Sequence, residues 1–340
     1  RSWAKQGDFV LAVGDVVPLA LAWFSGKPYA FIGTAKSEYH LRDEAGLLPN
    51  LPKSDRLAAR WGSVYYPWER WLMGHPRCKA VFPRDSLTVK ILQQFAIPAF
   101  DLGNPMMDGL LDSKQADSPS YYDGEAEQRE LARSFTLLLL PGSRIPEAYG
   151  NWQRILEAIR STIETFQGRS LLLLGAITPG LPLDPFVQGL REEGWQPPSI
   201  HPKSLPIPDP QAQCFVRDRA MLILTQEAYR ACLHQADVAI AMAGTATEQF
   251  VGLGKPAITI PGAGPQFTSH FAETQSRLLG PSVTLVRRPS QVGETLQSLL
   301  GNPDRLQLIV NNGRQRMGEG GAAHRIATCL TNLAEFPMRR

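Results

Sequence analysis

The segment LLLLPGSRIPE combines residue types that can hold an anion. Its four leucines are typical of a buried strand, and Gly142, Ser143 and Arg144 form the turn that leads from this strand into an amphipathic segment. Glycine lets backbone N–H groups approach a phosphate, a helix start carries partial positive charge, and arginine can donate two hydrogen bonds to phosphate oxygens. Alternatively, Ser143 is only a helix N-cap and Arg144 a solvated charge. The sequence leaves both interpretations open.

A second turn of this kind occurs in DVAIAMAGTATEQF. An apolar strand leads to Gly244, Thr245 and Ala246, and a short helix containing Glu248 follows. Glycine and small residues at the carboxyl end of a strand are typical of a nucleotide-binding crevice, where a glutamate can accept hydrogen bonds from both ribose hydroxyls. The spacing of Thr245 and Glu248 also fits a capping box, in which both side chains bond only to the helix backbone.

The loop PGAGPQF follows the next apolar strand and ends with a candidate ligand contact. The amide of Gln266 is both a donor and an acceptor, so it can bond to sugar hydroxyls or to a phosphate oxygen. The alternative is an ordinary solvent-exposed loop residue.

Asp15 lies in VGDVVP, where a strand ends and a helix begins. A carboxylate at this point can face an interdomain cleft and act as the base that takes a proton from an acceptor hydroxyl. It is equally well placed to cap the helix, and the sequence does not separate the two roles.

The segment RWGSVYYPWERWLMGHPRCK mixes aromatic and basic residues. Trp61, Trp68 and Trp71 with Arg70 suit a membrane interface or a lipid-like anionic acceptor, because indole rings favour the headgroup zone and cations meet phosphates. The alternative is a small aromatic core beneath a long loop.

The sequence lacks the residues that several classes of function require. The 340 residues contain 35 basic and 32 acidic side chains, an excess too small to predict binding of nucleic acid. No zinc-binding HExxH cluster, DxD pair, P-loop or GxSxG motif occurs, so we expect no metal site and no cofactor. We also expect no membrane-spanning helix, because the apolar run from Phe9 to Phe24 is broken by Asp15 and Pro18. The four dispersed cysteines suit a cytoplasmic protein.

Short apolar runs alternate with amphipathic segments along the whole chain, which predicts an α/β fold with parallel sheets. We expect a first Rossmann-like domain over residues 1–110, a polar linker over 111–134, and a second Rossmann-like domain with C-terminal helices over 135–340. The first part shows about half the strands of such a domain, so we expect it to be incomplete, with the rest upstream of Arg1. The proline-rich segment 179–211 predicts an irregular surface excursion.

Nine short apolar runs are predicted to be strands. They are Phe9–Gly14, Tyr29–Gly33 and Lys79–Pro83 in the first part, and Thr136–Leu140, Ser170–Gly175, Ala220–Thr225, Asp237–Gly244, Pro256–Gly262 and Ser282–Arg287 in the second. Asp15, the turn at Gly142 and the turn at Gly244 each follow one of these strands.

Taken in order, VGD, FIG, DLGNPMMD, LLPGSR, AGTATE and MGEGGAAHRIA resemble the lipid-A-disaccharide synthase family, whose members are GT-B glycosyltransferases. The resemblance implies two facing Rossmann-like domains and a UDP-sugar substrate. It makes the GSR turn and the GTATE helix the contacts of the nucleotide sugar, and it matches Asp15 to a functionally important aspartate. The plan also resembles MurG-type transferases and UDP-GlcNAc 2-epimerases, in which a glutamine loop like that of Gln266 meets the donor sugar.

The resemblance is weakest where the acceptor would bind. The family has a Ser-x-Ser-x-Trp-Ala-Trp stretch after the FIG strand, whereas this sequence reads GTAKSEYHLRD and continues into the aromatic segment. The expectation is inverting, metal-independent transfer of a GlcNAc-type sugar from a UDP-sugar to a lipid or lipid-linked acceptor, with Asp15 as base. A UDP-sugar 2-epimerase and a non-catalytic UDP-sugar-binding protein remain alternatives. Contact with the inner face of a membrane and a homodimer also stay open.

Overall fold

A computed structural model describes residues 6–110, 135–199 and 205–335. The chain forms two compact units, one made of Arg1–Ser113 with Gln315–Arg340 and the other of Lys114–Arg314. Each unit is built around its own sheet, parallel in unit 1 and mainly parallel in unit 2, with helices against it, so the predicted α/β class is confirmed. The predicted linker, 111–134, lies outside the described residues.

Unit 1 contains a three-stranded parallel sheet in the order β1-β2-β5. Its strands are β1 (Val10–Gly14), β2 (Tyr29–Gly33) and β5 (Cys78–Phe82). They agree with the three apolar runs of the first part. A short hairpin, β3 (Arg42–Asp43) with β4 (Gly46–Leu47), lies outside this sheet.

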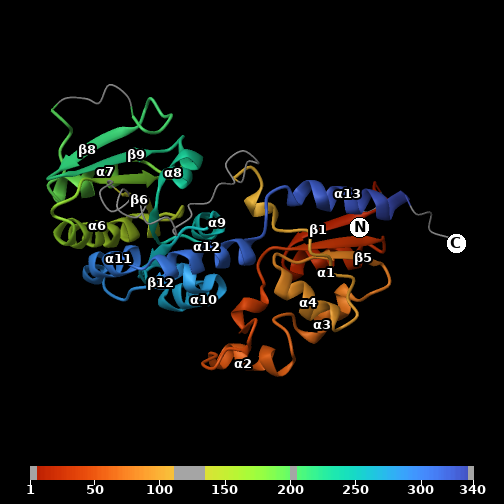
Figure 1. Cartoon of the computed structure of the whole chain (residues 1–340). Helices are drawn as coiled ribbons and strands as arrows, with labels where there is room; N and C mark the ends of the chain where they lie inside the picture. The colour runs from red at the N-terminus through yellow and green to blue at the C-terminus, as the bar shows by residue number, and fades with distance from the viewer. Residues whose placement is uncertain (1–5, 111–134, 200–204, 336–340) are drawn as a thin grey trace. The chain divides into compact units, whose positions relative to one another are not determined.

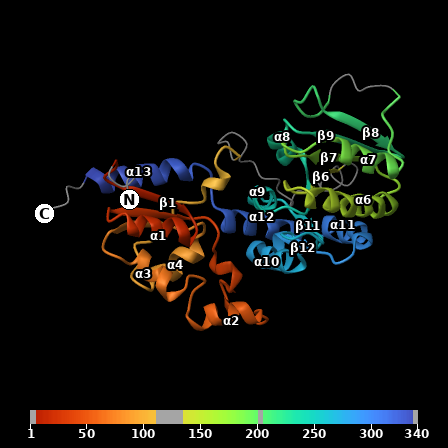
Figure 2. The same ribbon diagram turned by 180° about the vertical axis from the view of Figure 1, so that it is seen from behind.

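Helices lie against both faces of the unit 1 sheet and bury most of β2 and β5, whereas Leu11 and Val13 of the edge strand β1 stay 44% and 50% exposed. Figures 1 and 2 show α13 on one face and α1, α3 and α4 on the other. The helices of this unit are α1 (Val16–Phe24), α2 (Lys53–Arg60), α3 (Pro67–Met73), α4 (Ser86–Gln93) and α13 (Ala322–Glu335). Pro18 is tolerated in the first turn of α1, where the amide N–H has no partner within the helix.

The C-terminal helix belongs to unit 1 and not, as the sequence predicts, to the second domain. The carboxylate of Asp108 accepts the first backbone N–H groups of α13, from Ala322 and Ala323, both at 2.8 Å. The side chain of Arg325 donates to the carbonyl oxygen of Leu102 at 3.0 Å, and Ile326 is buried against the sheet. These contacts join segments more than 200 residues apart, which a pattern along the chain does not reveal.

Unit 2 contains a seven-stranded sheet in the order β12-β11-β10-β6-β7-β9-β8, parallel except for β8. Its strands are β6 (Thr136–Leu140), β7 (Leu171–Ala176), β8 (Gln213–Arg217), β9 (Ala220–Thr225), β10 (Val238–Ala241), β11 (Ala257–Thr259) and β12 (Val283–Leu285). The six predicted strands are confirmed, and β8 is an addition that the sequence analysis did not predict.

The helices of unit 2 lie on both faces of its sheet. They are α6 (Glu147–Thr165), α7 (Asp184–Glu192), α8 (Tyr229–Gln235), α9 (Thr245–Gly252), α10 (Ser269–Leu279), α11 (Val292–Leu300) and α12 (Pro303–Met317), the last of which continues into unit 1. One core joins α6, α7 and α11 to the sheet, while α8 and α9 contact β6 and β10.

The prediction of an irregular segment over 179–211 is wrong for its first half. The helix α7 lies there, and its Phe186, Val187 and Leu190 are buried against α6. Pro185 does not prevent the helix because it occupies the first turn. Within the described part of the chain, no helix is long and apolar enough to cross a bilayer.

Candidate functional site

The strand order of unit 2 reverses between β6 and β10. From β6 the chain proceeds to β7 and β9 on one side, and later to β10, β11 and β12 on the other. In open α/β sheets such a reversal opens a ligand-binding crevice at the carboxyl ends of the strands. The turn after β6 contains Gly142 and Arg144, and the turn after β10 contains Gly244, so the structure brings the two predicted turns together.

The two turns pack closely because Gly142 has no side chain. The backbone N–H of Met242 donates to the carbonyl oxygen of Leu140 at 2.8 Å. A β-carbon at Gly142 would lie 3.1 Å from the carbonyl oxygen of Met242, and the φ of Gly142 is +95°, a conformation that favours glycine. A larger residue at this position would separate the two turns.

Ser143 and Arg144 are both exposed at the mouth of the turn. Helix α6 begins only at Glu147 and its N-cap is Pro146, so Ser143 does not cap it and the interpretation of Ser143 as an N-cap is wrong. Among residues 6–110, 135–199 and 205–335, nothing pairs with the guanidinium of Arg144. Its five N–H donors are therefore available to an anion.

The turn after β10 leads directly into α9. The N-cap of α9 is Gly244, which has no side chain, so Thr245 and Glu248 do not form a capping box. Thr245 is exposed, and Ala246 and Glu248 are half-buried in the first turns of α9. The hydroxyl of Thr247 donates to the carbonyl oxygen of Ala243 at 2.6 Å and stabilises the turn.

Gln266 lies in the loop between β11 and α10, on the same edge of the sheet. Its backbone N–H and that of Phe267 donate to Oε1 of Glu147 at 3.2 and 2.5 Å. Since Glu147 is the first residue of α6, this contact holds the Gln266 loop next to the Arg144 turn. All eight predicted nucleotide-sugar contacts of unit 2 thus follow the carboxyl ends of β6, β10 and β11.

Two buried polar side chains that the sequence analysis missed hold these turns. Asn151 is 2% exposed, and its Nδ2 donates to the carbonyl oxygens of Pro141 at 3.0 Å and Met242 at 3.4 Å. Gln275 is 3% exposed, and its Nε2 donates to the carbonyl oxygens of Ala243 and Gly244, both at 3.1 Å. A polar residue on the inward face of an amphipathic helix was the available signal.

Asp15 lies in unit 1 and caps α1. Its Oδ1 accepts the backbone N–H of Val17 at 3.1 Å, and the side chain is exposed at the carboxyl end of β1. The capping role is therefore present. The role as a base stays a prediction.

Two carboxylates of unit 1 that the sequence analysis did not single out are buried near the ends of β2 and β5. Glu38 accepts from the hydroxyl of Ser63 at 2.5 Å and lies 2.9 Å from Arg42. Asp85 caps α4 by accepting the backbone N–H of Thr88 at 2.8 Å. Burial raises the pKa of both carboxyl groups, although their hydrogen bonds oppose the shift.

The aromatic segment of unit 1 divides into buried and exposed parts. Tyr65 is 3% exposed and belongs to the core, whereas Trp68 and Trp71 on α3 are 51% and 56% exposed. Trp61 packs edge to face on Tyr66. The interpretation as a small aromatic core therefore holds for only part of the segment.

Arg70 of the same segment is turned toward its neighbours. Its guanidinium stacks on the ring of Phe95 at 3.7 Å and donates to the carbonyl oxygen of Trp61 at 3.0 Å. Burial lowers its pKa. The positive charge of Arg70 thus lies beside Trp61 and Phe95.

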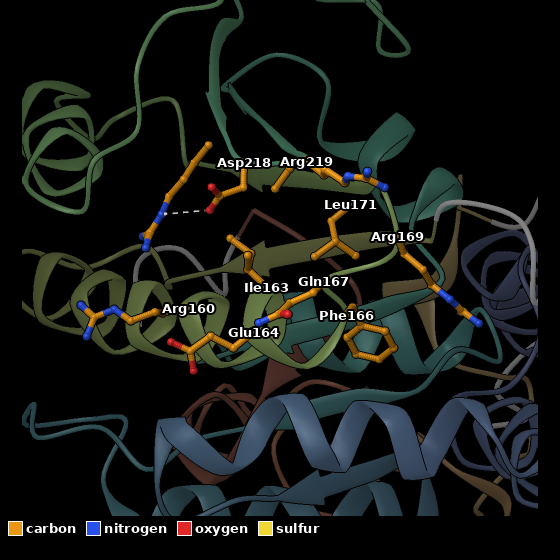
Figure 3. A pocket seen from close by; sticks show the side chains of 11 residues that line it. Arg160, Ile163, Glu164, Phe166, Gln167, Arg169, Leu171, Asp218 and Arg219 are labelled. Carbon is orange, nitrogen blue, oxygen red and sulfur yellow. Dashed lines mark ion pairs between the residues drawn. The ribbon is translucent and has the colours of Figure 1, made fainter.

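A cavity of about 480 Å³ lies at the opposite edge of the unit 2 sheet, where β7 and β9 begin. Figure 3 shows Arg160 and Arg169 at its two ends, extending away from each other. Arg217 forms an ion pair with Asp218 at 3.8 Å. Arg160 and Arg217 both form ion pairs with Glu193, at 2.5 and 3.6 Å, so their charges are already partnered. The residues that the sequence predicts for the site lie at the other edge of the sheet. The crevice between β6 and β10 remains the candidate site.

No protein-family model and no curated protein matches this sequence. Solved structures do. A protein assigned as a UDP-N-acetylglucosamine 2-epimerase from Listeria monocytogenes is 17% identical, with a TM-score of 0.55, over 98% of this chain and 76% of that one. The UDP-GlcNAc 2-epimerase of Neisseria meningitidis bound to UDP-GlcNAc is 17% identical, with a TM-score of 0.53, over 97% and 79%. Staphylococcus aureus MnaA with UDP is 14% identical, with a TM-score of 0.52, over 97% and 76%.

These likenesses show the fold. The chain is an α/β protein of GT-B type with two Rossmann-like sheets, as the sequence predicts. They assign no family, so the resemblance to lipid-A-disaccharide synthase stays a prediction.

Proposed function

We propose that this chain is a UDP-sugar-using enzyme that binds its nucleotide sugar in the crevice between β6 and β10. The observation that carries the proposal is the packing of the Gly142–Arg144 turn against the Gly244 turn at the point where the strand order reverses. Arg144 would bind the diphosphate, and Glu248 would accept hydrogen bonds from the ribose hydroxyls. Thr245, Ala246 and the other small residues leave room for the ligand.

Two of the similar structures hold UDP-GlcNAc or UDP, which supports the choice of a uridine nucleotide. Binding is tested by calorimetry with UDP on Arg144→Ala and Glu248→Ala. Each loses charge-assisted hydrogen bonds, so we expect UDP to bind about ten- to a hundredfold more weakly. Matched controls are Arg169→Ala and Glu273→Ala, which remove the same charges from unit 2 outside the crevice. Equal affinity in all four variants would remove the assignment.

Two reactions of a UDP-sugar are candidates. Epimerisation at C2 of the sugar comes first, because the similar structures are named as UDP-GlcNAc 2-epimerases. Transfer of the sugar to a lipid acceptor, the reaction of the lipid-A-disaccharide synthase family, comes second. It is favoured by the exposed Trp68 and Trp71 on α3 and would use Asp15 as base.

One experiment separates the reactions. The protein is incubated with UDP-GlcNAc labelled in the sugar, with and without a bacterial lipid extract. Label in the C2 epimer without lipid identifies an epimerase, and label in the lipid fraction identifies a transferase. Binding of UDP without any product would leave a non-catalytic nucleotide-sugar-binding protein.

A further inference from the structure

The contact between Glu147 and the Gln266 loop joins two segments of the candidate site that are far apart in the sequence. Oε1 of Glu147 accepts hydrogen bonds from the backbone N–H groups of Gln266 and Phe267, which follow Glu147 by 119 and 120 residues. A carboxylate oxygen that accepts two backbone donors makes stronger hydrogen bonds than a neutral acceptor does. The start of α6 therefore determines where this loop lies.

Gly264 makes room for the contact. A β-carbon at this position would lie 2.5 Å from Cγ and 2.6 Å from Cδ of Glu147, closer than atoms in van der Waals contact can approach. The atoms in the way belong to the end of a flexible side chain. A methyl group at position 264 would therefore displace the carboxylate and leave the backbone in place.

The loop presents Gln266 in a fixed position. Phe267 is 5% exposed and packs on Phe271, with 5.3 Å between the ring centroids. Gln266 itself is exposed, and its side-chain amide has no partner within the part of the chain that the structure describes. The backbone is thus held on both sides of a side chain that is available to a ligand.

We propose that Glu147 is a positioning residue for recognition of the sugar: it holds the Gln266 loop beside the Arg144 turn, and so adds the part of the affinity that depends on the sugar. The inference rests on the proposed function, because it requires a nucleotide sugar in the crevice. The nucleotide itself would be held by the turns after β6 and β10, which do not depend on this contact.

Calorimetry with UDP and with UDP-GlcNAc tests the proposal. We expect Glu147→Ala to weaken the binding of UDP-GlcNAc about tenfold and that of UDP less than about threefold, since both hydrogen bonds that position the Gln266 loop are lost. Glu147→Gln keeps an acceptor oxygen and should restore binding of UDP-GlcNAc to within about threefold of wild type. A role in stability alone would weaken both ligands alike.

Gly264→Ala tests the same contact from the other side. It should reproduce the loss of sugar-dependent affinity, and in the Glu147→Ala background it should add nothing, because the smaller side chain leaves space for the methyl group. Amide hydrogen exchange should show faster exchange at Gln266 and Phe267 in each single variant. Additive losses, or equal losses for UDP and UDP-GlcNAc, would overturn the positioning role. If the wild-type protein binds neither ligand, the proposed function itself fails, and the inference with it.

Discussion

Replacing Asn151 by leucine should destabilise unit 2 and loosen the crevice. The side chain is 2% exposed and donates to two carbonyl oxygens, those of Pro141 at 3.0 Å and Met242 at 3.4 Å. Loss of the shorter bond costs about 1 kcal/mol, and leaving buried carbonyl oxygens without this donor adds about 1–3 kcal/mol. Leucine has the same branched shape and the same number of heavy atoms but larger terminal groups, so no cavity contributes. We expect the free energy of unfolding to fall by about 2–4 kcal/mol.

The assay is urea denaturation. Because the chain has two units, one denaturation curve would combine the unfolding of both, so amide hydrogen exchange of β6 and β10 is measured to follow unit 2 alone. Glu157→Ala, on the exposed face of the same helix, is the control and should stay within about 0.5 kcal/mol of wild type. Asn151→Asp keeps the size but cannot donate, so it should be at least as destabilising as leucine. If Asn151→Leu matches the control, these hydrogen bonds do not hold the turns and the reasoning is refuted.

Four further predictions concern other parts of the chain. In urea denaturation, Gly293→Ala should lower the free energy of unfolding by about 2 kcal/mol or more, because the added β-carbon would lie 2.5 Å from a carbonyl oxygen of α6. Gly150 is exposed in α6, and a β-carbon there would meet no atom within 4 Å. Gly150→Ala should therefore raise the free energy of unfolding by about 0.5–1 kcal/mol. Burial lowers the pKa of Lys255 to about 8, below the 10.5 of the unfolded chain, so the unfolded chain binds more protons between these values. The free energy of unfolding should therefore rise with pH across that window, and Lys255→Met should remove this rise. Burial also raises the thiol pKa of Cys232, to about 12, so iodoacetamide at pH 8 should label the partly exposed Cys329 first, and equal labelling rates would contradict the burial.

The strands of both sheets could be predicted because their signal is local. A parallel strand covered on both faces is a short apolar run, as in Thr136–Leu140. This run can be recognised without knowing which strands lie beside it. Strand β8 (Gln213–Arg217) lacks this local signal. It is an antiparallel edge strand, and its partly exposed residues do not form a continuous apolar run.

The residues that stand at the ends of strands, and therefore most of the candidate site, could be predicted from the order of residues along the chain. Gly142, Arg144, Gly244 and Glu248 follow apolar runs directly, so their position at the carboxyl edge of a sheet needs only the order of residues along the chain. Whether Ser143 and Thr245 cap helices depended on where each helix begins, and only the structure decided that.

The contacts that hold these turns in place could not be predicted, because they join segments that are far apart in the sequence. Glu147 bonds to a loop 119 residues away and Asn151 to a carbonyl oxygen 91 residues away, and α13 joins unit 1 from the far end of the chain. Such partners are set by the way that distant segments pack, since a buried polar group bonds to whatever donor or acceptor the fold brings near it. The sequence could therefore predict Gln266 as a candidate ligand contact, but it could not predict that Glu147 bonds to the backbone of the Gln266 loop.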